Sequence, residues 1–164
     1  MSTDSFKSMC ESLDFPLTIV TAFDGHEHSG CLVGFHTQCS IAPRRWLVCV
    51  SKVNHTCGVA ERAEWLVVHL LRDDQHALAQ FFGAVTGDAI ALHEKFEYCS
   101  WQPGPGGTPI LEGCDWIAGR VIDRFEGGDH MLFLIEITEH GEAHAAAPQL
   151  GSQAVRDIRP GHPA

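Results

Sequence analysis

The fold is best predicted from one stretch of the chain, Arg45-Trp46-Leu47-Val48-Cys49-Val50-Ser51-Lys52-Val53-Asn54-His55-Thr56. An apolar strand-like run ends here and a helix-like run begins. Four polar side chains gather at this junction: Lys52, Asn54, His55 and Thr56. The first N–H groups of a helix are free and its dipole favours an anion, so such a junction can hold a phosphate. Taken alone, the stretch favours a simpler interpretation, an Asn/Thr cap on an ordinary helix.

The composition is that of one globular domain. The chain has 164 residues, of which 45% are hydrophobic and 20% charged. Its net charge of −10 argues against nucleic acid or an anionic membrane surface as a partner. No stretch is long and apolar enough to span a bilayer, and Met1–Lys7 lacks the basic start and apolar core of a secretory signal. We therefore expect a cytoplasmic protein without membrane or nucleic-acid partners.

The cysteines and histidines give no metal-binding pattern. The seven cysteines are odd in number and include no Cys-x-x-Cys, so we interpret them as reduced residues of the core. The eleven histidines are scattered, and neither His26 with His28 nor His140 with His144 has an evident third and fourth ligand. We expect no metal site. His69, inside an apolar run, is expected to be a hydrogen-bonded histidine of the core or of an interface.

Short strands separated by turns dominate the expected secondary structure. Helices are expected over 4–13 and 74–82, an irregular loop over 101–109, and strands over 17–23, 29–35, 46–51, 64–71, 115–125 and 130–138. This order favours an antiparallel barrel with helices on its outside. We divide the chain into an N-terminal helix (1–14), a barrel domain (15–144) and a C-terminal tail (145–164) that is flexible or lies on a partner subunit.

Four segments appear in a distinctive order. They are the opening strand 15–21; the strand containing Gly30, followed by Thr37, Ser40, Pro43 and the turn 52–56; the loop 101–111; and the Gly-Asp-His turn 127–133. From about Phe15 to about Glu142 the chain therefore resembles the flavin reductase-like group of FMN-binding split-barrel proteins. The resemblance implies a mainly β fold, an antiparallel Greek-key split β-barrel with peripheral helices. It also implies a homodimer with flavin in a groove at the subunit interface.

The resemblance also assigns the site. The flavin ring and ribityl chain would lie along Gly34, Phe35, His36, Thr37, Gln38, Cys39 and Ser40. The phosphate would meet Lys52, Asn54, His55 and Thr56. Phe82 would lie near the groove, or pack within its own helix. His130 would be the catalytic residue beside the flavin and the nicotinamide, oriented by Asp129, or only a turn residue.

Two departures from the family pattern affect this assignment. The chain has Gly34-Phe35-His36 where many members have small hydroxyl residues followed by Phe, and Ala42-Pro43-Arg44 where Asp-Pro-Pro is common. Backbone N–H groups at Gly34 can replace the missing hydroxyls, since glycine allows close approach. His36 either hydrogen-bonds a flavin carbonyl or fills the space.

The implied activity is NAD(P)H:flavin reduction. Hydride would pass from NADH or NADPH to bound FMN, with FAD as the other flavin, and reduced flavin would pass to an acceptor such as a monooxygenase. No Gly-x-Gly-x-x-Gly is present, so the nicotinamide would not be bound as in a Rossmann fold. Two alternatives remain: a non-catalytic flavin- or haem-binding module or electron carrier, and a barrel that has lost its cofactor and serves as an interaction domain.

Overall fold

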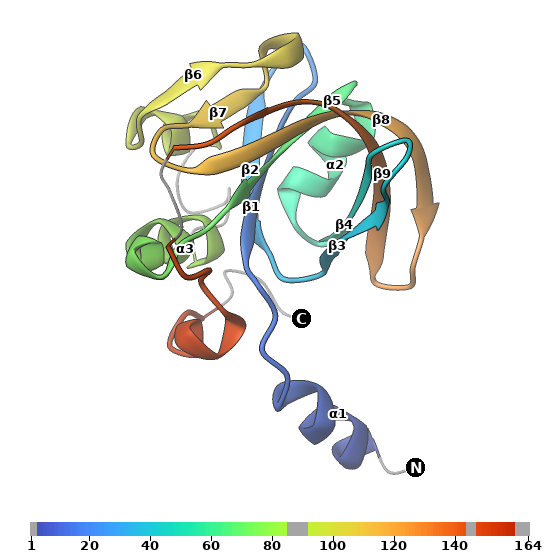
Figure 1. Cartoon of the computed structure of the whole chain (residues 1–164), viewed down its shortest axis with the longest axis vertical. Helices are drawn as coiled ribbons and strands as arrows, with labels where there is room; N and C mark the ends of the chain where they lie inside the picture. Colours follow the sequence, from blue (N-terminus) through green and yellow to red (C-terminus); the bar gives the residue numbers. More distant parts are fainter. Residues whose placement is uncertain (1–2, 85–91, 144–146, 160–164) are drawn as a thin grey trace.

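The computed structural model describes residues 3–84, 92–143 and 147–159. Its main feature is a seven-stranded antiparallel sheet in the order β2-β1-β5-β8-β9-β4-β3 (Figure 1). These strands are β1 Thr18–Phe23, β2 His28–Val33, β3 His36–Ser40, β4 Arg45–Ser51, β5 Trp65–Leu70, β8 Asp115–Glu126 and β9 His130–Gly141. A separate hairpin pairs β6 Trp101–Pro103 with β7 Pro109–Leu111.

One helix lies inside the curled sheet, and the other helices lie outside it. The α-helices are α1 Thr3–Glu11, α2 His55–Arg62 and α3 His76–Ala84, and short 3-10 turns are η1 Asp73–Gln75, η2 Leu92–Glu97, η3 Pro105–Gly107 and η4 Ser152–Val155. The sheet curls around α2, which contacts β1, β2 and β4 (Figure 1). Its edge strands β2 and β3 do not pair with each other. The expected antiparallel split barrel is therefore confirmed.

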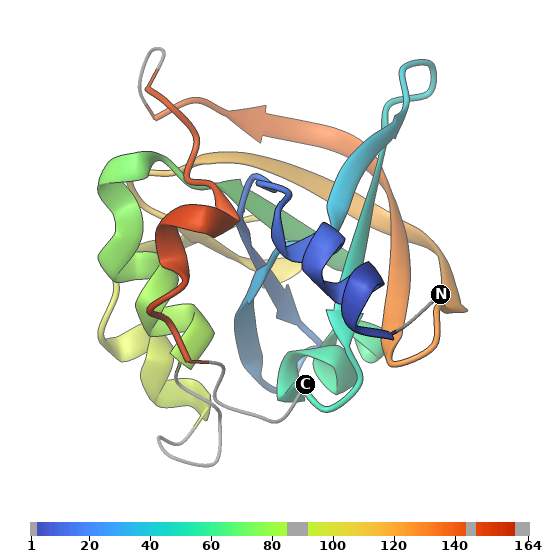
Figure 2. The ribbon, with the colours of Figure 1, turned by 90° about the horizontal axis from the view of Figure 1, so that it is seen from below.

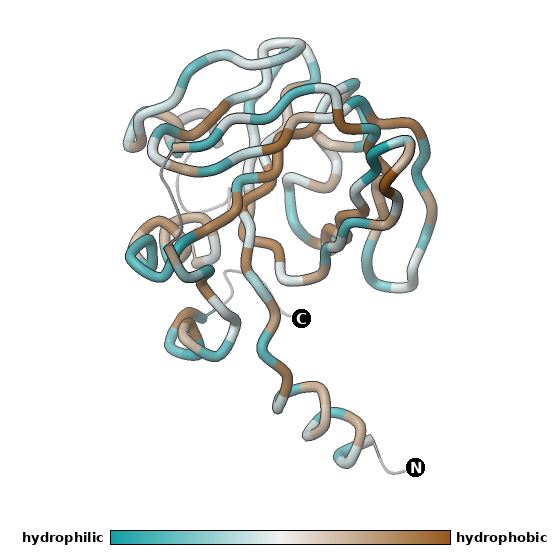
Figure 3. Tube along the Cα trace, viewed as in Figure 1, coloured by the Kyte–Doolittle hydropathy of each residue, from teal (hydrophilic) through white to brown (hydrophobic). Residues whose placement is uncertain are grey.

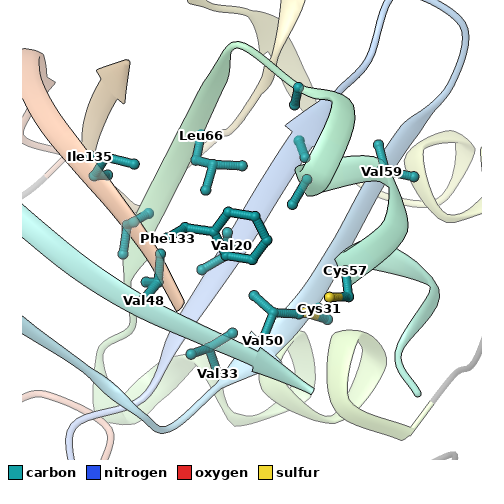
Figure 4. Close-up of a cluster of buried hydrophobic side chains, with 14 residues drawn as sticks. Val20, Cys31, Val33, Val48, Val50, Cys57, Val59, Leu66, Phe133 and Ile135 are labelled. Atoms are coloured by element: carbon teal, nitrogen blue, oxygen red, sulfur yellow. The ribbon is translucent and has the colours of Figure 1, made fainter. Parts of the chain in front are cut away.

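The barrel interior forms the main hydrophobic core. Alternate residues of the strands point inward, as the period of two requires, and meet the buried face of α2 (Figure 4). Phe133 and Val20 are fully buried in this core, and α2 contributes Val59, which is also fully buried. The hydrophobic stretches in Figure 3 follow the central strands β1 and β5, where β5 is buried on both faces as expected.

The C-terminal residues 147–159 are not the flexible tail that we expected from their composition. The backbone N–H of Leu150 donates to the Leu71 carbonyl at 2.9 Å, and Leu17 N–H donates to the Leu150 carbonyl at 2.8 Å. Leu150 is 1% exposed and joins a second core with Val155 and Phe82. Figure 2 shows this segment beside α3. Buried side chains and backbone hydrogen bonds to residues 15–17 and 71–73 therefore hold a stretch that lacks any sequence period.

Two further elements differ from expectation. The loop expected over 101–109 starts with strand β6 and ends at the first residue of its partner β7, and each strand includes a proline that hides the strand pattern. The strand β3 was not expected, because its burial pattern leaves the three central residues exposed and shows no apolar alternation. Within the part of the chain that the structure describes, β3 is an edge strand paired with β4 alone, so its sequence needs no buried face.

Helix α1 projects away from the barrel (Figure 1). The helix expected over 4–13 is confirmed but ends at Glu11, so Leu13 lies beyond it. Phe6, Met9 and Leu13 are all exposed large hydrophobics. A nine-residue helix is marginal in water without tertiary packing, so we expect its apolar side chains to pack against another surface. Among the described residues, no helix is both long enough and apolar enough to cross a bilayer.

Candidate functional site

The turn between β8 and β9 brings Asp129 and His130 to the end of β4. His130 lies directly opposite Ser51 in the antiparallel register. The Lys52 backbone N–H donates to the Asp129 carbonyl at 2.9 Å, which fixes the turn against the start of the β4–α2 connection. Gly128 has φ +104°, a conformation that favours glycine, so the turn before Asp129 requires this residue.

His130 and Asp129 form a hydrogen-bonded pair at the surface. His130 Nδ1 lies 2.8 Å from Asp129 Oδ1, and a carboxylate only accepts, so Nδ1–H donates. This bond, together with the charge of the imidazole, holds the pKa of Asp129 below its usual value. The pairing leaves His130 Nε2 for another partner. The ring of Phe35, itself 56% exposed, lies 5.3 Å from the His130 ring between centroids.

Lys52 adds a cation beside this pair. Its Nζ lies 3.3 Å from Glu126 Oε2, and the Glu126 side chain is 77% exposed. An exposed ion pair of this kind is worth about 0–1 kcal/mol, so a phosphate can displace Glu126 at small cost. No pattern in the sequence singles out Glu126. It reaches Lys52 only because β8 and β4 both flank β9, which is a property of the sheet order.

The N-terminus of α2 is capped by its own sequence. Asn54 Oδ1 accepts from the Thr56 backbone N–H at 2.9 Å, so the interpretation of an Asn cap is confirmed. The Thr56 side chain is buried, and its hydroxyl lies 2.9 Å from the Ser29 hydroxyl. The Thr56 hydroxyl therefore points into the protein interior, away from any ligand at the surface. His55 remains accessible and lies 3.2 Å from Glu27 through Nε2.

The predicted flavin segment spreads along β3. His36 lies opposite Val48 and Ser40 opposite Arg45, so the strand runs away from the His130 end of β4. The exposed central residues keep short local bonds: Thr37 Oγ1 donates to the Gln38 carbonyl at 3.2 Å, and Gln38 Nε2 donates to the Ser40 carbonyl at 3.2 Å. Cys39 between them is exposed and free.

Gly34 and His36 behave differently from each other. A Cβ added at Gly34 would meet only Leu17 Cδ2 at 3.6 Å, so packing does not require glycine there and its backbone is open to approach. His36 Nε2 donates to the Pro16 carbonyl at 2.8 Å, and its ring stacks on Trp46 at 5.7 Å between centroids. Burial lowers the pKa of His36. The structure thus favours His36 as a residue that fills space.

Phe82 lies away from this surface. It is 1% exposed, packs in the second core, and approaches Gly30 so closely that a Cβ there would lie 2.9 Å from its ring. This burial favours packing in the core over contact with a flavin at the surface. The structure thus brings Phe35, Lys52 and His130 together at one end of the barrel. Among the described residues, no group of three His, Cys, Asp or Glu side chains could hold a metal ion.

Comparison with known proteins identifies the family. The family model described as "Flavin reductase like domain" matches residues 10–154. This chain belongs to the flavin reductase-like family. The family that the four ordered segments suggested is therefore confirmed, and the match extends into the C-terminal segment beyond Glu142.

Relatives of this flavin reductase-like protein agree with that identification. It is 28% identical over 135 residues to the 4-hydroxyphenylacetate 3-monooxygenase reductase component of Escherichia coli, covering 80% of this chain and 77% of the relative. It is 27% identical over 150 residues to the flavin-dependent monooxygenase reductase subunit HsaB of Mycobacterium tuberculosis H37Rv, covering 88% and 75%. Its fold matches flavin reductase HpaC complexed with NADP+, with a TM-score of 0.80 at 18% identity, covering 94% and 96% of the two chains.

Proposed function

We propose that this protein is an NAD(P)H-dependent flavin reductase that supplies reduced flavin to a monooxygenase. The observation that carries the proposal is the surface group formed by Phe35, Lys52 and the His130–Asp129 pair in a chain of this family. The names of its relatives support a two-component system, since both the Escherichia coli and Mycobacterium tuberculosis proteins are reductase parts of monooxygenases.

The residues at this end of the barrel fit a flavin mononucleotide. Phe35 offers an exposed aromatic face, and Gly34 beside it leaves its backbone accessible. Lys52 and His55 provide exposed donors near the α2 N-terminus, where the helix dipole favours an anion. Bound there, flavin supplies the hydride chemistry, and the protein supplies orientation and a phosphate anchor. FMN fits the anchor, and FAD is the alternative that the binding experiment distinguishes.

His130 positions the nicotinamide in this proposal. Because Nδ1–H is engaged by Asp129, the ring is fixed and presents Nε2 outward. A neutral imidazole held in this tautomer accepts a hydrogen bond at Nε2, as from a carboxamide N–H. Proton uptake at Nε2 would add a positive charge that offsets negative charge developing nearby. No general base is needed, because hydride transfer removes no proton from the substrate.

We also propose a homodimer. The exposed side chains of Phe6 and Met9 in α1, with Leu13 beyond its end, and the edge of β3 that pairs with no other strand among the described residues offer surface for a second copy. Sedimentation should give twice the monomer mass of 18.0 kDa. A monomer that still binds flavin tightly would refute the interface site.

A cytoplasmic location is supported by the seven free cysteines, which an oxidising compartment would not preserve.

The decisive experiment is a flavin titration followed by anaerobic addition of NADH and, separately, NADPH. We expect the purified protein to bind FMN and to bleach its visible absorption on adding a nicotinamide. A haem-like spectrum, or flavin that binds but is not reduced by either nicotinamide, would overturn the proposal in favour of a binding module or electron carrier. A colourless protein that ignores both FMN and FAD would instead indicate an interaction domain.

A further inference from the structure

A cavity lies at the end of the barrel where β4 begins, opposite the His130 end. It has a volume of about 230 Å³, and its apolar wall is formed by Trp46, Ile117 and Ile137. All three pack against the barrel core as its partly buried rim. The cavity is therefore the open end of the barrel interior, where the inward-facing side chains stop filling the space.

Basic side chains surround the mouth of this cavity. Arg44, Arg45 and His140 line it together with the apolar wall. Arg45 is engaged with Glu136 at 3.4 Å, whereas Arg44 is exposed and makes no ion pair within residues 3–84, 92–143 and 147–159. Two adjacent arginines at one apolar opening are notable in a chain with 11 basic and 21 acidic residues. Arginine also offers a planar fork of donors that matches a carboxylate.

The indole N–H of Trp46 is a hydrogen-bond donor without an acceptor among the described residues. Its nitrogen, Nε1, is buried. Buried Trp N–H groups usually find a partner, so an unpaired one calls for an explanation such as a bound molecule. The far side of the indole is covered by the stacked ring of His36, with 18° between the planes. The indole is thus fixed in place.

We propose that this cavity binds a small aromatic carboxylate. The apolar wall and the Trp46 indole would hold the ring, and Arg44 and Arg45 would bind the carboxylate at the mouth. The volume is below the roughly 300–1,000 Å³ typical of sites for drug-sized ligands, so it admits one ring with a short acidic chain and excludes a flavin.

The cavity is separate from the flavin end of the barrel. Arg45 and Ser51 are the two ends of the seven-residue strand β4, and Ser51 lies opposite His130. At about 3.3 Å per residue, these ends are about 20 Å apart. Of the predicted flavin residues, Gln38 alone also lines this cavity. The cavity is therefore distant from His130, although the predicted flavin segment along β3 reaches it at Gln38, and the competition with FMN described below distinguishes two sites from one.

The test is a titration of the flavin-free protein with phenylacetate, followed by the indole N–H resonance of Trp46 in ¹H–¹⁵N spectra. Trp46→Phe assigns that resonance among the four tryptophans. We expect saturable binding at one site. The chemical-shift change of the Trp46 resonance should be larger than the changes of the other indole resonances. Arg44→Gln should raise the dissociation constant about 10- to 100-fold, because it removes a charge-assisted bond. Arg156→Gln, at an exposed arginine outside the cavity, should leave it unchanged.

Two comparison ligands separate the parts of the site. Benzyl alcohol keeps the ring without the charge, and acetate keeps the charge without the ring, so both should bind at least 10-fold more weakly than phenylacetate. Equal binding of acetate, or an Arg44→Gln protein that binds phenylacetate like the parent, would overturn the proposal. Competition by FMN for the same Trp46 shift would show a single shared site and overturn it as well.

Discussion

His130 Nδ1 donates to Asp129 Oδ1 across 2.8 Å, although the two residues are neighbours in the chain and both lie at the surface. Adjacent residues in an extended strand point to opposite faces, so such a pair forms only where a turn changes the direction of the backbone. Gly128, with φ +104°, supplies that change. The consequence is an imidazole whose tautomer and orientation are fixed before any ligand arrives.

The first prediction concerns this imidazole. His130→Asn should reduce the rate of flavin reduction at saturating NADH, because it removes the group that positions the nicotinamide and offsets charge. Flavin should still bind, and the free energy of unfolding should change by less than about 1 kcal/mol, since His130 is the first residue of β9 and is not among the residues of the barrel core. Stopped-flow reduction and urea unfolding measure the two effects.

His76 provides a matched control for that substitution. Its Nε2 lies 3.1 Å from Asp157 Oδ1 in another surface His–Asp pair, far along the chain from the flavin end. His76→Asn should leave the reduction rate unchanged. If His130→Asn reduces flavin as fast as the parent with the same nicotinamide affinity, His130 only ends a turn.

The second prediction concerns the phosphate anchor. Lys52→Ala should weaken FMN binding by about 1.5–3 kcal/mol, or about 10- to 100-fold, because charge-assisted bonds to phosphate are lost. Riboflavin lacks the phosphate, so its affinity should hardly change. Fluorescence titration of both flavins against both proteins gives the comparison.

Two variants sharpen that test. Glu126→Gln removes the carboxylate that now pairs with Lys52 at 3.3 Å, so FMN should bind at least as tightly as to the parent. Lys7→Ala removes an exposed lysine paired with Glu11 at 3.8 Å and should have no effect on either flavin. Equal losses of FMN and riboflavin in Lys52→Ala would contradict the assignment of the phosphate.

Much of the fold could be predicted from the sequence because inward-facing residues repeat with a period of two. Phe133 and Ile135 in β9 show that pattern and are fully buried as it requires. The hairpin β6–β7 and the C-terminal segment could not be predicted in this way. Their strands are too short for a period, and their contacts, such as Leu150 with Leu71, join residues far apart in the sequence.

The candidate site was predicted in part for a related reason. Lys52 was singled out because it follows a clear strand signal, whereas His130 was proposed through the family resemblance, and the sheet places their strands β4 and β9 side by side. Whether a side chain faces the surface or the core depends on packing that one chain segment does not encode. Thr56 and Phe82 look like ligands in the sequence, yet both are buried in the structure.

The third prediction tests the structural role of the C-terminal segment. Leu150→Ala should lower the free energy of unfolding by about 2–5 kcal/mol, because it leaves a cavity in the second core at a side chain that is 1% exposed. Ile41→Ala, at a side chain that is 83% exposed, should change it by less than about 0.5 kcal/mol. Urea unfolding gives both values, and equal stabilities would mean that the segment does not pack on the barrel.

His69 links the stability of the barrel to pH. The side chain is fully buried, its Nδ1–H donates to the Ile19 carbonyl at 3.0 Å, and its Nε2 accepts from the Leu111 N–H at 2.9 Å. The expectation of a hydrogen-bonded core histidine is confirmed. A second proton on Nε2 would face the Leu111 donor and place a charge in the core. Burial accordingly lowers the pKa of His69 to about 4.

The last prediction follows from this pKa. Above pH 6.5 His69 is neutral in both the folded and the unfolded chain, so it adds no pH dependence. Between pH 6.5 and about 4 only the unfolded chain takes up the proton, so folding stability falls as the pH falls, by up to about 3 kcal/mol. His69→Gln keeps a donor and an acceptor but cannot titrate, so unfolding in urea across this range should depend less steeply on pH, by about one proton. His76→Gln, at a half-exposed histidine, should keep the parent's slope. An unchanged slope in His69→Gln would mean that other groups cause the acid destabilisation, even if the substitution lowers stability at every pH.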